Sequence, residues 1–377
     1  MDRVAAALVD NLRRHHAGTI EVTPIAPQFV RRATRFAART GGWSFTADRF
    51  LNRLWDYPLH VGRLANDYDL FHVVDHSYSQ LVHRLPPGRA IVTCHDLDTF
   101  RALLHPVEEP RSWFFKAMVR HVLTGMQRAA RVTCDSATVR DEVISRGLVA
   151  ADRVVVAAIG TAPEYSSRPD PDADREAARL VAAPAGAIEL LHVGSTMPRK
   201  RIDLLLRICG ELRGELTNLH LIRVGGAFTP DQRRLAQAVG MDSRTSVVEF
   251  VDDRTLAAIY RRATIVLLPS DREGFGLPLV ESMACGTPVV VSDLPVFREV
   301  GGTAAEYCAP GSVSPWSQRV LELLHERRYA PERWAARREA GQARARRMTW
   351  TAFAARLAQV YREVAADADP MLVRTPA

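Results

Sequence analysis

Short apolar runs alternate with amphipathic segments along most of the chain. Near-continuous apolar runs are typical of parallel strands that are covered on both faces, and the segments between them have the periodicity of helices. The first half of the chain therefore predicts an α/β domain with a parallel sheet. Its expected strands are residues 19–26, 68–75, 90–96, 131–136 and 153–160.

A second array of strands follows residues 166–186, which are rich in proline, aspartate and alanine and which we expect to form an interdomain linker. Two such arrays predict two doubly wound domains that face a cleft, with ligands bound beyond the carboxyl ends of the strands. We expect these domains at residues 1–170 and 185–347, and an amphipathic helix at 348–367 that packs back towards the first domain. The strands expected in the second domain are residues 188–195, 219–226, 246–252, 263–270 and 287–293.

The chain opens directly on a helical pattern, in which Val4, Leu8, Val9 and Leu12 share one face. A doubly wound domain normally opens with a strand and a turn before such a helix. We therefore expect the first strand to be missing, through a misplaced start codon. The alternative is that another part of the chain replaces this strand.

The composition narrows the class of protein. A chain of 377 residues fits two domains, and a hydrophobic content of 47% allows two sizeable cores. No apolar run reaches the ~18 residues of a spanning helix. Asp10, Arg13 and Arg14 stand where a signal peptide needs an apolar block, so we expect a cytoplasmic protein.

Charge and cysteine usage exclude further classes. The formal charge of +7 comes almost entirely from arginine, since Lys116 and Lys200 are the only lysines. Such arginine- and alanine-rich usage indicates a coding bias, so we expect no nucleic-acid partner. The cysteines form no CxxC pair, which predicts buried apolar side chains in a reducing compartment and no zinc or redox site. They are Cys94, Cys134, Cys209, Cys285 and Cys308.

One loop combines glycine with paired carboxylates. The sequence EGFGLPLVESMACGTPVVVSD, residues 273–293, follows an expected strand and enters a short helix at about Pro278. Glycines let a ligand approach the backbone, and the free N–H groups at a helix start favour phosphate. Glu273 and Glu281 have the spacing to face one cleft, where a carboxylate can accept two sugar hydroxyls. The alternative is that both only favour the helix N-terminus electrostatically.

This string, extended through LPVFREVGG, resembles the signature of the retaining glycosyltransferase family 4, whose members have two Rossmann-like domains in the GT-B fold. The seven residues between Glu273 and Glu281 match the spacing of that signature. The resemblance covers about residues 68 to 365. Four further segments match in order, namely TCHDL, HVGSTMPRKRIDLLL, EFVDDRTLAAIYRRATIVLLPS and MTWTAFAARLAQVY.

The resemblance implies a site for a nucleoside diphosphate sugar. Breaking the anomeric C–O bond builds negative charge on the diphosphate, which cations and N–H dipoles stabilise. Arg199 and Lys200 are implied to bind this diphosphate, and Arg199 compensates for Ser195, where many relatives have arginine. Glu273 is implied to face the donor sugar, Glu281 to bind the ribose and Val251 to hold the base, while Glu299 helps to shape this wall. The remaining implied donor-binding residues are Gly194, Gly274, Phe275, Gly276 and Leu277.

His95 is the residue of the first domain that the resemblance places at the reacting centre, in contact with the donor sugar. Asp96 either orients this ring or only caps the next helix. The patterns HDLD and DPDAD resemble the DxD pairs that hold a metal in other transferase folds. Two acids this close recur by chance, so we expect neither an obligatory metal nor a cofactor.

The acceptor side is less well marked. Residues 75–80 and the helix expected at 113–131 line the first domain in our interpretation. The sequence WFFKAMVRHVL mixes aromatic and cationic residues. We expect its apolar side to pack on the sheet. The alternative is peripheral contact with an anionic membrane at its inner face.

We therefore expect a retaining hexosyltransferase of surface glycan assembly, with a saccharide or a lipid-linked acceptor. The phosphate loop is similar to those of mannosyl- and rhamnosyltransferases, which favours mannose. One alternative is a nucleotide-sugar epimerase of the same fold. The other is a truncated, non-catalytic protein that binds nucleotide sugar or acts as a scaffold.

Overall fold

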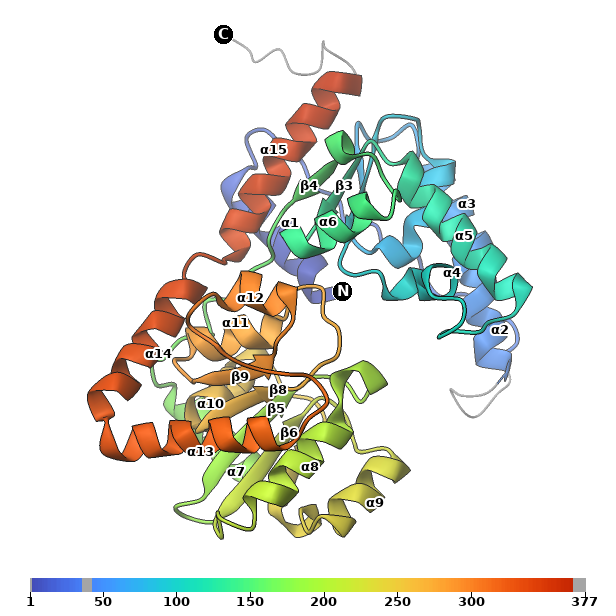
Figure 1. The fold of residues 1–377 in the computed structure, drawn as a ribbon. Coiled ribbons are helices and arrows are strands. Elements are labelled where there is room, and N and C mark those ends of the chain that lie inside the picture. Colours follow the sequence, from blue (N-terminus) through green and yellow to red (C-terminus); the bar gives the residue numbers. More distant parts are fainter. Residues whose placement is uncertain (1, 36–42, 369–377) are drawn as a thin grey trace. The chain divides into compact units, whose positions relative to one another are not determined.

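The computed structural model describes residues 2–35 and 43–368 and divides the chain into two compact units (Figure 1). The first unit contains Met1–Ala158 together with Thr351–Ala377, and the second contains Ile159–Trp350. Each unit holds one sheet of parallel strands with its own hydrophobic core. Among the described helices, none combines the length and the apolar character needed to cross a bilayer.

The sheet of the first unit has four strands in the order β1-β2-β3-β4. The central strand β2 is buried along its whole length, as the apolar run predicts, and β3 pairs with it so that Cys94 lies opposite Cys134. This register places the residues after both strands at the same edge of the sheet. The strands are β1 (Phe71–Val73), β2 (Ala90–Cys94), β3 (Arg131–Cys134) and β4 (Val154–Val156).

Helices from both ends of the chain belong to the first unit. The last helix, α15 (Trp350–Ala368), packs Val360 and Val364 against Ile91 of β2. Its Tyr361 hydroxyl lies 2.6 Å from the Nδ1 atom of His72 on β1. The other helices are α1 (Asp2–His15), α2 (Trp43–Leu51), α3 (Tyr57–Arg63), α4 (Arg101–Leu104), α5 (Trp113–Arg128) and α6 (Ala137–Ser145).

The strand expected at residues 19–26 does not form. The chain from residue 20 to 31 contains neither helix nor strand, and no side chain from 21 to 30 is fully buried. The β-favouring composition of this segment is overridden because strand preference depends on burial against a sheet. Within the described residues, no strand precedes Phe71.

The sheet of the second unit has six strands in the order β10-β9-β8-β5-β6-β7. Five of them follow the predicted apolar runs, but residues 249–252 leave the sheet after β7, where Phe250 is exposed. The strand at the other edge, β10, was not predicted because its sequence, EYC, is not an apolar run. The strands are β5 (Ile188–Val193), β6 (Leu219–Val224), β7 (Thr245–Val248), β8 (Ile265–Leu268), β9 (Val289–Ser292) and β10 (Glu306–Cys308).

Seven further helices and α7 (Pro171–Val181) cover the second sheet in the described part of the chain. Helix α7 corrects the expected linker at 166–186. Asp170 caps its N-terminus, and Ala173, Ala177 and Val181 form a buried face at helical spacing. The others are α8 (Ile202–Leu212), α9 (Pro230–Ala238), α10 (Asp253–Arg262), α11 (Leu277–Ala284), α12 (Pro295–Gly301), α13 (Ser314–Tyr329) and α14 (Pro331–Ala345).

The five cysteines are all buried and unoxidised, as expected for apolar side chains. Burial raises the pKa of Cys209 and Cys285 to about 12. A thiol with so high a pKa is a poor nucleophile at neutral pH. The cysteines therefore contribute to packing.

Candidate functional site

The strand order of the second sheet reverses at β5. The chain runs from β5 to β6 and β7 on one side, and places β8, β9 and β10 on the other. Ligands of doubly wound sheets bind at such a reversal, beyond the carboxyl ends of the strands. The loops that follow β5, β6 and β8 meet at this edge, and they carry most of the predicted site residues.

Two of these loops touch through glycine. Gly194 follows β5 and Gly225 follows β6, and a Cβ atom on Gly225 would overlap the carbonyl oxygen of Gly194. Gly225 also has a φ of 109°, which side chains disfavour. Glycine is therefore required at 225 for the two loops to approach each other. The strand expected at residues 219–226 ended in Gly225 and Gly226, but the sequence analysis assigned these glycines no role.

An ion-pair cluster joins the loop after β5 to the loop after β8. Lys200 Nζ lies 2.5 Å from Glu273 Oε1, and Arg199 Nη1 lies 3.2 Å from Glu273 Oε2. Ser270 donates its hydroxyl to Glu273 Oε1 at 2.8 Å. All three charged side chains are largely buried, so their charges are weakly screened. Three predicted residues, 73 and 74 positions apart, are thus brought into direct contact.

Backbone contacts fix this cluster. The amide of Asp271 donates to the carbonyl of Arg199 at 2.8 Å, and Arg199 Nη1 donates to the carbonyl of Arg272 at 3.0 Å. The next residue, Arg201, pairs with Asp271 at 3.0 Å and has a left-handed φ of 50°. Such strain in a residue other than glycine persists only where its surroundings hold it. The two cations are therefore pre-positioned rather than free to sample solvent.

Helix α11 begins beside this cluster, at the glycine-rich loop. Gly276 caps the helix with a φ of 91°, and a Cβ atom there would lie 2.6 Å from Cε1 of Phe297. Gly274 and Phe275 are buried just before the helix, and Leu277 is its first residue. The predicted N–H groups thus stand at the start of a helix, where backbone donors have no partner within the helix.

Glu281 lies further along α11 and is only 2% exposed. Tyr260 of α10 donates its hydroxyl to Glu281 Oε2 at 2.8 Å. Burial first, and then the neighbouring carboxylate, raise the pKa of Tyr260 well above its usual value. Val251, predicted to hold the base, lies partly buried in the turn between β7 and α10.

A buried guanidinium lies under the same edge, and the sequence analysis missed it. Arg223 on β6 is fully buried and donates to the carbonyls of Val224 and Gly225. Burial lowers its pKa to about 10, which leaves it charged at neutral pH. Next to it, burial and then Arg223 lower the pKa of His192 well below its usual value. An arginine inside the apolar run LHLIRV was the available signal.

His95 belongs to the first unit and lies just beyond β2. Its Nδ1 atom donates to Asp135 Oδ2 at 2.6 Å, and its Nε2 atom donates to the carbonyl of Val74 at 2.8 Å. Burial lowers the pKa of this ring, but the Asp135 carboxylate and these hydrogen bonds raise it more, to about 9. His95 is therefore an imidazolium at neutral pH, with both ring nitrogens occupied.

Asp135, which the sequence analysis did not single out, is the carboxylate that orients His95. Asp96 accepts from the amide of Asp98 at 3.0 Å, but the N-cap of the short helix Asp98–Phe100 is Leu97, so the capping alternative does not hold. The signal for Asp135 lay in two similar strings, VTCH and VTCD, at the ends of neighbouring strands. Because Cys94 and Cys134 are paired in the sheet, the residues after them are neighbours.

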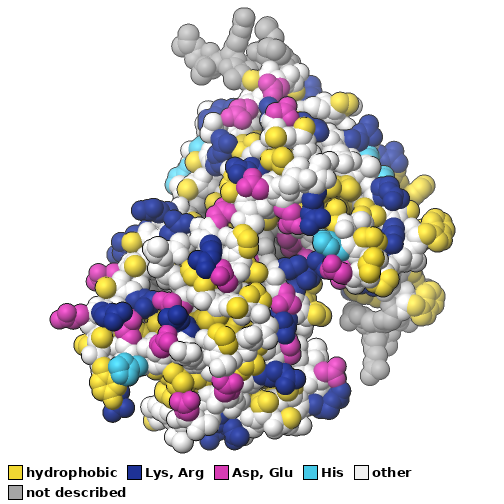
Figure 2. All heavy atoms as spheres, viewed as in Figure 1, with side chains coloured by type: hydrophobic (Ala, Val, Ile, Leu, Met, Phe, Trp, Pro, Cys, Tyr) yellow, Lys and Arg dark blue, Asp and Glu magenta, His cyan; other side chains and the backbone are white. Residues whose placement is uncertain are grey.

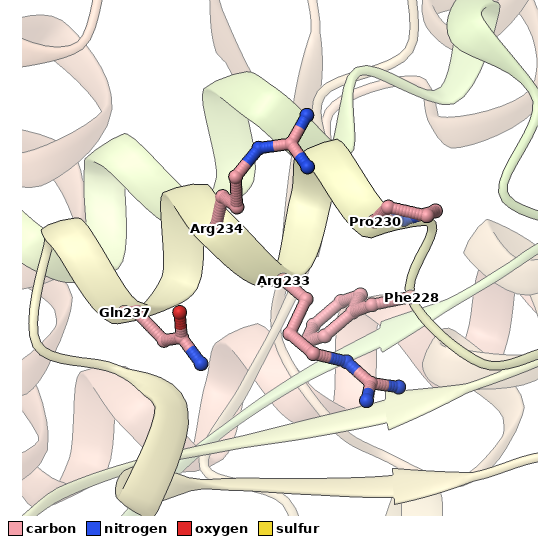
Figure 3. A pocket seen from close by; sticks show the side chains of 5 residues that line it. All are labelled: Phe228, Pro230, Arg233, Arg234 and Gln237. Carbon is pink, nitrogen blue, oxygen red and sulfur yellow. The ribbon is translucent and has the colours of Figure 1, made fainter.

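A hollow of about 390 Å³ opens on α9, and none of the predicted site residues lines it (Figure 3). Its lining side chains come from α9 and the residues just before it, as Figure 3 shows. Over the ranges 2–35 and 43–368, no three His, Cys, Asp or Glu side chains cluster as metal ligands do. The residues around the hollow are Phe228, Pro230, Arg233, Arg234 and Gln237.

Two protein families match the chain. Residues 1–164 match Glycosyltransferase Family 4, and residues 175–343 match Glycosyl transferases group 1. The two matches fall on the two units of the structure. Together they extend over most of the chain.

Curated relatives are moderately similar. O-antigen chain mannosyltransferase B of Escherichia coli is 29% identical over 250 residues, which cover 65% of this chain and 63% of that protein. D-inositol 3-phosphate glycosyltransferase of Thermobispora bispora is 32% identical over 212 residues, covering 52% of this chain and 47% of that protein. The chain thus spans between about half and just under two thirds of the length of these relatives.

Solved structures share the fold at low identity. WaaG, a glycosyltransferase involved in lipopolysaccharide biosynthesis, has a TM-score of 0.70 and 15% identity, and the match covers 95% of each chain. Sucrose-phosphate synthase from Thermosynechococcus elongatus has a TM-score of 0.67 and 22% identity, covering 83% of this chain and 78% of that one. At these identities the likeness establishes the fold alone.

Proposed function

The chain belongs to the GT-B glycosyltransferases of group 1 and family 4, and on that premise we propose that it transfers a hexose from a nucleoside diphosphate sugar. The acceptor is a hydroxyl of a saccharide or of a lipid-linked saccharide, and the anomeric configuration is retained. Mannose is the favoured hexose, because a relative that covers 65% of the chain is named a mannosyltransferase. The proposed setting is the assembly of a surface glycan.

The observation that carries this proposal is the contact of Glu273 with both Arg199 and Lys200 at the sheet reversal. In the transfer, the bond between the anomeric carbon and the diphosphate oxygen breaks, and its electron pair stays on the diphosphate. The acceptor oxygen forms the new bond to that carbon and passes its proton to the oxygen of the departing diphosphate. Arg199 and Lys200 stabilise the charge that develops on the leaving diphosphate.

Glu273 has two tasks in this proposal. It holds the two cations in position, and it presents carboxylate oxygens to the hydroxyls of the donor sugar. The glycine-rich loop adds backbone N–H donors beside the phosphates. These cations and donors supply the charge stabilisation that a bound metal supplies in other transferases, so we propose that no metal is obligatory.

His95 is kept as a proposed catalytic residue, and it carries a fixed positive charge. Both of its ring nitrogens donate within the first unit, and its pKa of about 9 keeps it protonated. A protonated imidazole cannot take a proton from the acceptor. The ring is therefore assigned to electrostatic stabilisation and not to general base catalysis.

The substitution Glu273→Gln tests the proposal. We expect the transfer rate from a nucleoside diphosphate hexose to fall by roughly 10²–10³-fold, as for loss of a group that stabilises the transition state. Transfer is measured as release of nucleoside diphosphate with a panel of donors and saccharide acceptors.

Glu326→Gln is the matched control. Glu326 is equally buried, with a side chain 10% exposed against 9% for Glu273, and it too pairs with an arginine, Arg337. It lies on α13, outside the proposed site. Full transfer by a folded Glu273→Gln variant would overturn the role of Glu273, whereas equal loss in both variants would assign the effect to stability.

A further inference from the structure

Arg223 is a buried cation without an acidic partner. It lies on β6, its side chain is fully buried, and it stays charged at neutral pH. No carboxylate among the described residues pairs with it, and its Nε atom has no hydrogen-bond partner there. Burial of a charge is costly unless another group compensates it. Stability alone therefore does not account for an arginine at this position.

Other largely enclosed arginines of the second unit have the partner that Arg223 lacks. Arg262 Nε lies 2.7 Å from Oε2 of Glu189, and Arg337 Nε lies 2.9 Å from Oε1 of Glu326. The side chains of these two arginines are 25% and 21% exposed, so they also retain some contact with water. The most deeply buried guanidinium of the three is thus the one without a counter-ion.

The guanidinium of Arg223 lies against the loops that follow β5 and β6. Its Nη2 atom donates to the carbonyl of Gly225 at 3.2 Å, and its Nη1 atom donates to the carbonyl of Val224. The Val224 carbonyl also accepts the amide of Gly194 at 3.0 Å. Carbonyl oxygens carry partial negative charge, which repels phosphate. Arg223 therefore neutralises two carbonyls at the edge where the proposed phosphates bind.

The touching glycines connect Arg223 to the ion-pair cluster. A Cβ atom on Gly225 would lie 3.3 Å from Nη1 of Arg223 and 2.3 Å from the carbonyl oxygen of Gly194. A Cβ atom on Gly194 would lie 3.6 Å from the Cδ and Cε atoms of Lys200. Arg223 and Lys200 thus both pack against this pair of glycines.

His192 lies next to both cations. It pairs with Arg223 in register across β5 and β6, and its Cε1 atom lies 3.3 Å from the Cβ position of Gly194, beside Lys200. Burial, and then the charges of Arg223 and Lys200, lower the pKa of this ring well below its usual value. The neutral ring therefore fills the space beside the two cations without adding a third positive charge.

The charge of this region matches that of a diphosphate. Glu273 neutralises one of the cations Arg199 and Lys200, so their cluster keeps one net positive charge, and Arg223 adds a second. The diphosphate of a sugar donor carries one negative charge on each phosphate. On the visible face of the second unit, basic and acidic side chains are interspersed and form no broad basic patch (Figure 2). The loops of the proposed site, and not this surface, therefore supply the matching charge.

We infer that Arg223 is a positioning residue for the donor diphosphate. It acts through the loop carbonyls of Val224 and Gly225, which it holds, and through its own charge, which the bound diphosphate compensates. This inference rests on the proposed function. The alternative is a purely structural clamp on the two loops, which predicts a different response of stability when the charge is removed.

The substitution Arg223→Met separates these roles in the full chain. Methionine occupies similar space without a charge, so we expect the urea midpoint without ligand to be unchanged or higher. Calorimetry with UDP, GDP, dTDP and ADP identifies the nucleoside diphosphate that the wild type binds most tightly. Its affinity should fall about tenfold in the variant, and that of the matching monophosphate about threefold or less. Binding of the diphosphate should also depend less steeply on salt concentration.

Two further variants complete the test. Arg223→Lys restores a charge and should recover most of the affinity that Arg223→Met loses. Arg337→Met is the matched control, because Arg337 lies on α14 and pairs with Glu326. The control should lower the urea midpoint, since it leaves a buried carboxylate without its partner, and should keep nucleotide affinity unchanged.

Three outcomes would overturn the role of Arg223. They are a lower urea midpoint or loss of folding in Arg223→Met, diphosphate affinity equal to that of the wild type, or an equal loss of affinity for the diphosphate and the monophosphate. If the wild type binds none of the four nucleoside diphosphates, the proposed function itself fails, and this inference fails with it.

Discussion

At the scale of single residues, the two proposed charge centres are built in opposite ways. Glu273 is an anion held between two cations, whereas His95 is a cation held by one carboxylate and one carbonyl. Each group is partly shielded from water, and charges interact more strongly where water is excluded. Removal of one member therefore leaves a largely buried charge without its partner.

The pairing of His95 with Asp135 predicts a pH-dependent stability. The folded pKa of His95, about 9, is above its ordinary value of 6.5. The stabilisation is therefore complete below pH 6.5 and is lost as the pH rises through 9. Its upper limit is on the order of 3 kcal/mol.

Urea unfolding of the wild type and of Asp135→Asn between these pH values measures this effect. We expect the difference in unfolding free energy between the two proteins to be largest at the acid end and to shrink towards the alkaline end. The contributions of the other titrating groups to the unfolding free energy are the same in both proteins and cancel in the difference. A gap that is the same at every pH would mean that His95 is not protonated in the folded chain.

At the scale of elements, the start of α11 depends on one glycine. Gly276 combines a left-handed φ of 91° with close packing against Phe297. An alanine at position 276 would hold a strained backbone conformation, and its Cβ atom would overlap the ring of Phe297. Helix α11 would shift, and with it the N–H groups beside the ion-pair cluster.

We predict that Gly276→Ala lowers the unfolding free energy by about 2–4 kcal/mol, from backbone strain plus overpacking. Gly311→Ala is the control, because Gly311 has a φ of 90° but nothing within 4 Å of its Cβ position. Gly311→Ala should lower the unfolding free energy by about 1–2 kcal/mol, from backbone strain alone. Equal losses in the two variants would show that Phe297 moves aside.

At the scale of the whole molecule, the chain has two units with separate sheets and cores, and the proposed phosphate-binding residues all belong to the second. Binding of a nucleoside diphosphate should therefore stabilise the second unit directly. A ligand at ~100 times its dissociation constant adds about 2.7 kcal/mol of stability.

Thermal melting with UDP, GDP, dTDP and ADP measures this effect and identifies the base. We expect one of these nucleotides to raise the melting temperature. The Lys200→Met variant should need about a tenfold higher concentration of it for the same rise, because a charge-assisted contact is lost. Lys116→Met is the control, since it removes the only other lysine and lies in the first unit. An equal shift in Lys200→Met and the wild type would remove Lys200 from the site.

Much of the fold was readable from local patterns. The apolar runs located β2, β3, β5, β6, β8 and β9 because strands that are buried on both faces are apolar at most positions. The same reasoning proved wrong at residues 19–26, where the run is not buried, and it missed β10 and α7. For these segments, length or composition gave a weak signal, and contact with the sheet decided the structure.

The sequence by itself determined the two parallel sheets and the glycine-rich loop, and its motifs selected Arg199, Lys200 and Glu273. These features depend on residues that are close together in the sequence. Only the tertiary structure decided that those three side chains touch, that Asp135 holds His95, that Arg223 is a buried cation and that Trp113 faces outward. The reason is physical, since strand order and register set which distant residues meet, and burial sets how strongly their charges interact.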